Sequence, residues 1–241
     1  MYTTCPKCGH TRKPGEGTAD ACPACGLIYA KYIKQRFAAH PGEQPLPESS
    51  AQSTVRGLLL DQHDEDGYAF YGRAALWAGL AIYGVKLARM DVPEWEMASS
   101  LIHLPMVPIH EFGHVAFMAF GEFMHLLGGS LFQAGLPIAL GLIFLWRRNP
   151  FAAAVMLWWS AVAVMDIAPY VYDAQQPVHV LLTGRTGETG AHDFIDVLGD
   201  LGLLTRAQSV GYVVHRVGAA MLALALAWGA AILVRAWHAK R

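Results

Sequence analysis

The sequence predicts an α-helical integral membrane bundle, with about four spans plus a re-entrant element, and a small N-terminal zinc-ribbon domain. Of the 241 residues, 54% are hydrophobic and 15% are charged, whereas a typical soluble protein has about a quarter charged residues. The hydrophobic residues gather in long runs beyond residue 70, and all four cysteines lie in the polar stretch before them. The net charge of −1 gives no reason to expect a nucleic-acid partner.

The four cysteines form two Cys-x2-Cys pairs separated by 13 residues: Cys5, Cys8, Cys22 and Cys25. A glycine directly follows each pair, which suits a tight backbone turn. Two such pairs can surround one Zn²⁺ with four thiolates. The opening residues MYTTCPKCGH contain no apolar core of a signal peptide, so we expect a cytoplasmic head, where disulfides rarely persist. The pattern therefore predicts a structural zinc that supplies most of the folding energy of this head.

The composition divides the chain into three parts. Residues 1–37 are the ribbon and a following helix, residues 38–70 are a linker and juxtamembrane segment, and residues 71–241 are the membrane-embedded domain. The stretch 38–54 is rich in Pro, Ser, Glu and Gln, so it buries little apolar surface and is expected to be a flexible linker.

Five apolar segments follow, each close to the roughly 20 residues that cross a bilayer as a helix: 74–90, 98–120, 126–146, 151–172 and 209–236. Five full crossings would place Arg147, Arg148 and the basic C-terminal tail outside, against the positive-inside tendency. A re-entrant start of segment 126–146 removes this conflict, and its glycines and proline also favour an extended edge for a substrate strand. We expect the bacterial inner membrane, with the ribbon in the cytoplasm.

The sequence HEFGH lies inside the second apolar segment. His110 and His114 are four residues apart, so on a helix both imidazoles lie on one face and can bind one Zn²⁺. Glu111 lies beside them as the candidate general base for a zinc-activated water. An ionisable group in a membrane segment is by default a functional hypothesis. The alternative is that both histidines are neutral and hydrogen-bonded within the bundle.

HEFGH in an apolar segment resembles the site-2-type intramembrane zinc metalloproteases. This resemblance implies a zinc metalloendopeptidase in which a carboxylate from a later membrane segment, usually in an Asp-Gly pair, completes the site. No Asp-Gly pair follows the motif here. Three residues remain candidates for the third ligand: His192 and Asp193 first, then Asp166. Asp193 is alternatively a helix N-cap. Asp166 is alternatively a residue that orients a zinc-bound histidine, or a hydrogen-bonded residue at a helix end before Pro169.

The sequence thus predicts two zinc ions, one catalytic and one structural. The expected function is hydrolysis of a peptide bond in or near a membrane segment of a protein or peptide substrate, and the lipid bilayer is the other expected partner. Two other classes remain open. One is a non-catalytic membrane protein with a zinc-dependent interaction or sensing role, and the other is a transporter, in which intramembrane His and Asp mark an ion path.

Overall fold

The computed structural model describes residues 3–13, 15, 16, 18, 20–32, 50–61, 67–181, 184–189 and 192–240. The chain divides into two compact units, Met1–Gln52 and Ser53–Arg241, and each is described by itself. In the described residues the regular elements are helices, and pairing between extended segments is limited to isolated bridges. The predicted α-helical class is therefore confirmed.

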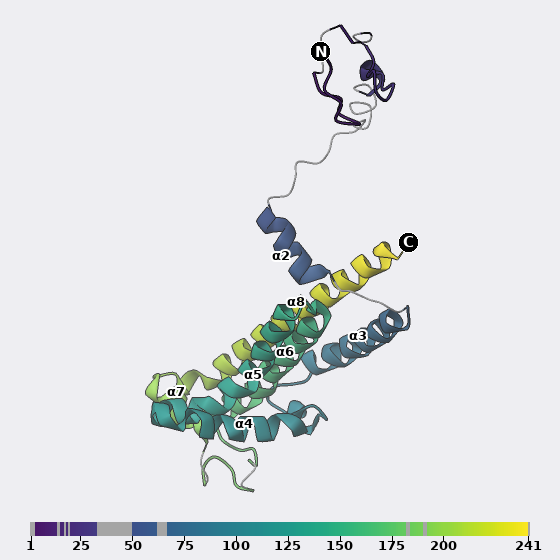
Figure 1. Ribbon diagram of the computed structural model, residues 1–241. Helices are drawn as coiled ribbons and strands as arrows, with labels where there is room; N and C mark the ends of the chain where they lie inside the picture. Colours follow the sequence, from purple (N-terminus) through teal and green to yellow (C-terminus); the bar gives the residue numbers. More distant parts are fainter. Residues whose placement is uncertain are drawn as a thin grey trace. The chain divides into compact units, whose positions relative to one another are not determined.

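Figure 1 shows the helices and their labels. The α-helices are α2 (Ser50–Leu60), α3 (Gly67–Ala88), α4 (His103–Phe117), α5 (Glu122–Trp146), α6 (Pro150–Asp173), α7 (Asp193–Asp200) and α8 (Ala207–Ala239). Short 3-10 turns are η1 (Glu96–Ser99), η2 (Met118–Phe120) and η3 (Leu204–Arg206). The five predicted apolar segments fall in α3, in α4 with its flanking turns, and in α5, α6 and α8.

Among the described residues, three helices are long and apolar enough to cross a membrane: Glu122–Trp146, Pro150–Asp173 and Leu204–Ala239. Helix α4 has 15 residues, so it is about 22 Å long, shorter than the roughly 30 Å of a hydrocarbon core. The protein therefore has the helices of a membrane protein, while the predicted four-span topology remains a prediction.

The expected break at the start of segment 126–146 is wrong. Helix α5 runs from Glu122 to Trp146 without interruption and contains Gly128, Gly129 and Pro137. The predicted extended edge is therefore helical, and its backbone groups bond within the helix. The glycines serve another purpose, which is close packing. A Cβ at Gly128 would lie 2.8 Å from the carbonyl oxygen of Gly113 in α4, and a Cβ at Gly113 would collide with the carbonyl oxygen of Gly128.

Helix α6 is the most buried of the long helices and packs against both α5 and α8 (Figure 1). The α6–α8 contact depends on small residues. A Cβ at Gly218 of α8 would lie 2.9 Å from the carbonyl oxygen of Ala161, and one at Gly211 would lie 3.0 Å from that of Ala168. Small residues let backbones approach closely, which is how helices associate in an apolar environment.

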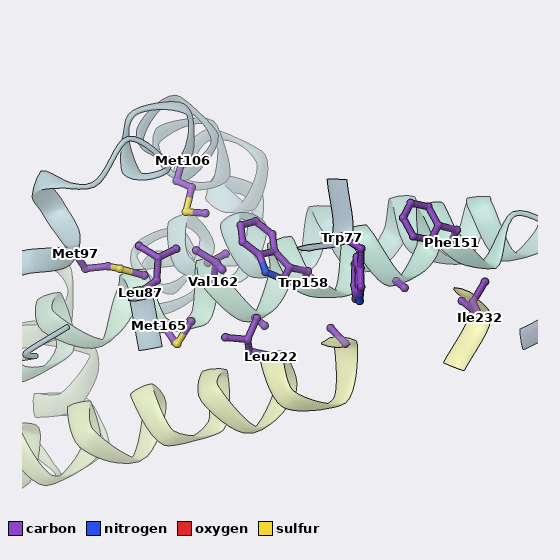
Figure 2. Close-up of a cluster of buried hydrophobic side chains, with 14 residues drawn as sticks. Trp77, Leu87, Met97, Met106, Phe151, Trp158, Val162, Met165, Leu222 and Ile232 are labelled. Carbon is purple, nitrogen blue, oxygen red and sulfur yellow. The ribbon is translucent and has the colours of Figure 1, made fainter. Parts of the chain in front are cut away.

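The main hydrophobic cluster joins α3, α6 and α8 to the turn before α4. Trp158 of α6, Trp77 of α3 and Leu222 of α8 all belong to this cluster (Figure 2). Trp158 and Leu222 both lie next to Gly84 of α3, whereas Trp77 lies next to Gly229 of α8. Both indoles donate hydrogen bonds to main-chain carbonyls, Trp158 to Leu80 (3.0 Å) and Trp77 to Leu226 (3.3 Å). This cluster fixes α6 as the rigid element on which the site described below depends.

The stretch expected to be a flexible linker, 38–54, differs from expectation in the part that the structure describes. Residues 50–60 form α2, and α3 already begins at Gly67, so the C-terminal part of the expected flexible stretch 38–54 is helical. Residues 38–49 and 62–66 lie outside the described residues. The helix predicted after the ribbon is described only over 29–32, and its remainder, 33–37, also lies outside them.

Candidate functional site

The four cysteines of the N-terminal unit gather at one point, as predicted. Their sulfur atoms all lie within 4.8 Å of one another, and the distances from Cys5 to Cys25 and from Cys8 to Cys22 are both 3.7 Å. These separations are far longer than a disulfide bond of about 2.05 Å, so the group holds thiols close enough to bind one metal ion.

Two equivalent turns build this cluster. In the first, the amide of Gly9 donates to the carbonyl of Cys5 (3.0 Å), and in the second, the amide of Gly26 donates to that of Cys22 (2.9 Å). Both glycines have positive φ, +73° and +69°, a conformation that costs glycine little. The prediction that each glycine serves the turn after its cysteine pair is therefore confirmed.

A second group of side chains that could hold a metal ion lies in the unit Ser53–Arg241, called the helical unit from here on. It contains His110, His114 and Asp193. The two histidine rings, one helical turn apart on α4, have centroids 4.8 Å apart. Asp193 Oδ2 lies 3.6 Å from His110 Nε2 and 3.4 Å from His114 Nε2. Residues separated by about eighty positions in the sequence thus place three metal-ligating atoms together.

Helix α7 and Tyr170 hold the Asp193 carboxylate at this position. Asp193 is the first residue of α7, so its backbone amide needs a partner outside the helix. That amide donates to the Tyr170 hydroxyl (3.0 Å), and the hydroxyl donates to Asp193 Oδ2 (3.2 Å). These two bonds direct Asp193 Oδ2 toward the two histidine rings.

The Nδ1 atoms of both histidines are bonded away from the metal-ligating group. His110 Nδ1 lies 2.9 Å from Gln133 Oε1, and His114 Nδ1 lies 2.8 Å from the main-chain oxygen of His125. A carbonyl oxygen only accepts, so each Nδ1 donates, and the Nε2 of the neutral ring keeps its lone pair. His125 returns a bond from its own Nδ1 to the carbonyl of His114 (2.8 Å).

These residues fit a bound metal ion. The Nε2 atoms of both histidines lie within 3.6 Å of one carboxylate oxygen of Asp193, an arrangement of lone pairs that is repulsive without a cation among them. Two histidines and one carboxylate are a known ligand set of catalytic zinc, which leaves a fourth position open. The absence of a side chain at Gly129 leaves space for an ion beside the two rings, because a Cβ there would lie 2.6 Å from the Nε2 atoms of both histidines.

Glu111 is exposed and lines a cavity of about 700 Å³ next to this group. The same cavity is bordered by the two histidines and Asp193, and by apolar side chains from three parts of the chain, including Val107, Ile167 and Leu181. Trp95 forms part of its rim, where its ring stacks on His179 with centroids 4.6 Å apart. The Glu111 carboxylate, the three side chains of the metal-ligating group and several apolar side chains therefore line the same cavity.

The structure does not bring His192 to the metal-ligating group. Its backbone is extended (φ −139°) as the N-cap of α7, so its ring points away from the Asp193 side chain. His192 is 2% exposed, its ring packs against Tyr170 with centroids 4.3 Å apart, and its Nε2 lies 3.6 Å from Oδ2 of the buried Asp173. Of the candidates for the third ligand, the structure therefore favours Asp193 over His192.

Asp166 also lies outside the ligating group, although it is linked to it. Its Oδ2 accepts from Gln133 Nε2 at 2.9 Å, and its carboxylate contacts His103 Nδ1 at 2.9 and 3.0 Å. Of the alternatives for Asp166, the structure thus favours the one that orients a histidine ligand, through Gln133. His103 itself is separated from the ligand atoms by Asp166 and Gln133.

Sequence reasoning missed Tyr170 and Gly129. A signal for Tyr170 was present, because Asp166, Tyr170 and Asp173 are spaced four and three residues apart in an otherwise apolar helix. Such spacing places polar groups on one face. Gly129 carried no comparable signal, since its role depends on which helix packs against α5.

Comparisons with known proteins add no assignment: no family model, no curated protein and no solved structure matches this chain.

Proposed function

We propose that this protein is a membrane-embedded zinc metalloendopeptidase with a zinc-ribbon head. The observation that carries the proposal is the convergence of His110, His114 and Asp193 beside a cavity that Glu111 also lines. The three long apolar helices of the same unit support a membrane location. In this proposal the N-terminal cysteines hold a separate, structural zinc.

The chemistry divides between the metal and the side chains around it. Zinc bound at His110, His114 and Asp193 would lower the pKa of a water molecule and polarise the substrate carbonyl. Glu111 takes the proton as the water oxygen adds to the peptide carbon. It then gives that proton to the amide nitrogen as the C–N bond breaks, so the carboxylate is regenerated. Tyr170 keeps Asp193 in place, and the apolar lining of the cavity excludes bulk water.

The substrate that best suits the cavity is an apolar peptide segment. Its lining side chains offer van der Waals contact rather than charge, apart from the residues near the metal-ligating group. A peptide must be extended for its carbonyl to reach a catalytic group, and an unfolded membrane segment of a protein would meet both requirements. We therefore propose a membrane segment, or a peptide beside the membrane, as the substrate.

Profiling of protein N-termini in membranes tests the proposal. Membranes from cells that produce the wild-type protein are compared by mass spectrometry with membranes containing the His110→Ala/His114→Ala double variant at the same level. We expect new N-termini within or beside apolar segments only with the wild-type protein, and their loss when a zinc chelator is added during expression. Identical sets of N-termini in the two samples would contradict a protease.

Two observations separate this proposal from the other classes. A zinc-dependent interaction or sensing protein does not need the Glu111 carboxylate at the metal. Glu111→Gln should therefore leave such a protein functional, whereas it should stop cleavage by a protease. A transporter needs polar groups along a path through the bundle. In the described part of the helical unit, the buried ionisable side chains are Asp166, Asp173 and His192, which come from the C-terminal part of α6 and from the residue next to Asp193 rather than from positions spread along α6.

A further inference from the structure

Gln133 is a polar side chain that is only 4% exposed, in the middle of the apolar helix α5. Its amide makes two directed contacts. Oε1 lies 2.9 Å from His110 Nδ1, and Nε2 donates to Asp166 Oδ2 at 2.9 Å. We propose that Gln133, oriented by Asp166, is a positioning residue that fixes the tautomer of His110 and thereby sets the metal affinity of the site. This inference rests on the proposed metal at His110, His114 and Asp193.

The direction of the amide follows from what each partner can do. An ionised carboxylate only accepts hydrogen bonds, so Asp166 must face the NH₂ group of Gln133. The amide oxygen then faces His110, and His110 Nδ1 must be the donor. In a neutral imidazole only one nitrogen carries the proton, so Nε2 has the free lone pair that binds a metal. Asp166 therefore determines the proton position on a ring it does not touch.

The burial of Asp166 and Gln133 restricts the Gln133 amide to one orientation. Asp166 is 9% exposed, and a buried carboxylate is costly unless its oxygens are hydrogen-bonded. Gln133 and His103 supply those bonds. A flipped Gln133 amide would direct its oxygen at the carboxylate, which would break that contact. It would also direct its NH₂ at His110 Nδ1, which could then only accept, so that the ring proton would move to Nε2. The chain of bonds connects α4, α5 and α6, so the helix packing itself holds the tautomer.

Zinc affinity of the full-length protein tests this role. The affinity of the zinc in the helical unit is obtained by titration with a competing chelator, after subtraction of the curve for the His110→Ala/His114→Ala variant. In Gln133→Met, which keeps similar volume but cannot accept the bond, we expect 10- to 100-fold weaker binding. The matched control is Ser160→Ala. Ser160 is equally buried in the α5–α6 contact and donates to the carbonyl of Ala134 (2.8 Å), but it does not contact a ligand residue.

Substitutions of Asp166 separate orientation from mere packing. In Asp166→Asn the amide oxygen can still accept from Gln133, so we expect zinc affinity within a few-fold of the wild type. In Asp166→Leu this acceptor is gone and Gln133 is free to flip, so we expect a loss approaching that of Gln133→Met. Equal affinity for Asp166→Leu and the wild type would overturn the role of Asp166.

A measurement on the unmodified protein covers the case of variants that fail to fold. The ¹⁵N chemical shifts of His110 in the zinc-loaded wild type should show a protonated Nδ1 and a metal-bound Nε2. A metal-bound Nδ1, or wild-type affinity in Gln133→Met, would overturn the positioning role alone. Absence of any zinc in the helical unit of the wild-type protein would instead contradict the proposed function, so the two failures are distinguishable.

Discussion

The Glu111→Gln variant should hold as much zinc as the wild type and cleave its substrates at a rate lower by about two to four orders of magnitude. That range is typical for the loss of a general base. Glu111 lines the cavity but does not belong to the group of three ligating side chains, and glutamine has nearly the same shape. The substitution therefore removes a proton acceptor and leaves the metal site intact. Fragment formation in membranes and zinc per chain are the two measurements.

Glu122→Gln is the matched control for this prediction. Glu122 is an exposed carboxylate in the first turn of α5 and does not border the cavity, so the same chemical change there should leave cleavage unaltered. Wild-type cleavage by Glu111→Gln would exclude Glu111 as the base, and with it the proposed mechanism. A variant that keeps its zinc and every biological effect of the protein would favour the interaction or sensing class.

Gly129→Ala should remove the zinc of the helical unit and all cleavage, while the fold is retained. The added Cβ would lie 2.6 Å from Nε2 of both His110 and His114, in the space that a metal ion needs. Alanine favours a helix over glycine by about 1 kcal/mol, and the crowded atoms are side-chain tips rather than backbone. We therefore expect thermal unfolding close to that of the wild type, with one zinc fewer per chain.

Gly135→Ala provides the comparison within the same helix. A Cβ at Gly135 meets no other atom within 4 Å, so this variant gains the same helix preference without crowding the histidines. It should keep both zinc ions and full activity. If Gly129→Ala retained its second zinc ion and its cleavage activity, the zinc could not lie between the Nε2 atoms of His110 and His114 beside Gly129.

The helices could be predicted from the sequence because apolar length and helical periodicity are local properties. The same is true of the cysteine pairs with their glycines and of the spacing of His110 and His114. The break expected at Gly128 and Gly129 was wrong for a related reason. Glycine weakens a helix locally, but here its lack of a side chain allows α4 and α5 to touch, and that contact is not visible in a local pattern.

The rest of the site depends on contacts between distant parts of the chain. Adjacent residues at a helix start face different directions, so the sequence could place the third ligand near His192–Asp193 but could not choose between them. The choice is made by the backbone turn at α7 and by Tyr170. Gln133 could not be placed in the site from the sequence for the same reason, because its partners, His110 and Asp166, come from two other helices, α4 and α6.

Zinc content of the purified full-length protein can be measured by elemental mass spectrometry against chain concentration, and it reports directly on the metal centre at His110, His114 and Asp193. We expect two zinc ions per chain in the wild type and one in the His110→Ala/His114→Ala double variant, because the cysteine cluster is unaffected by that change. A wild-type protein with one zinc, and a double variant with the same one, would contradict a metal centre at His110, His114 and Asp193.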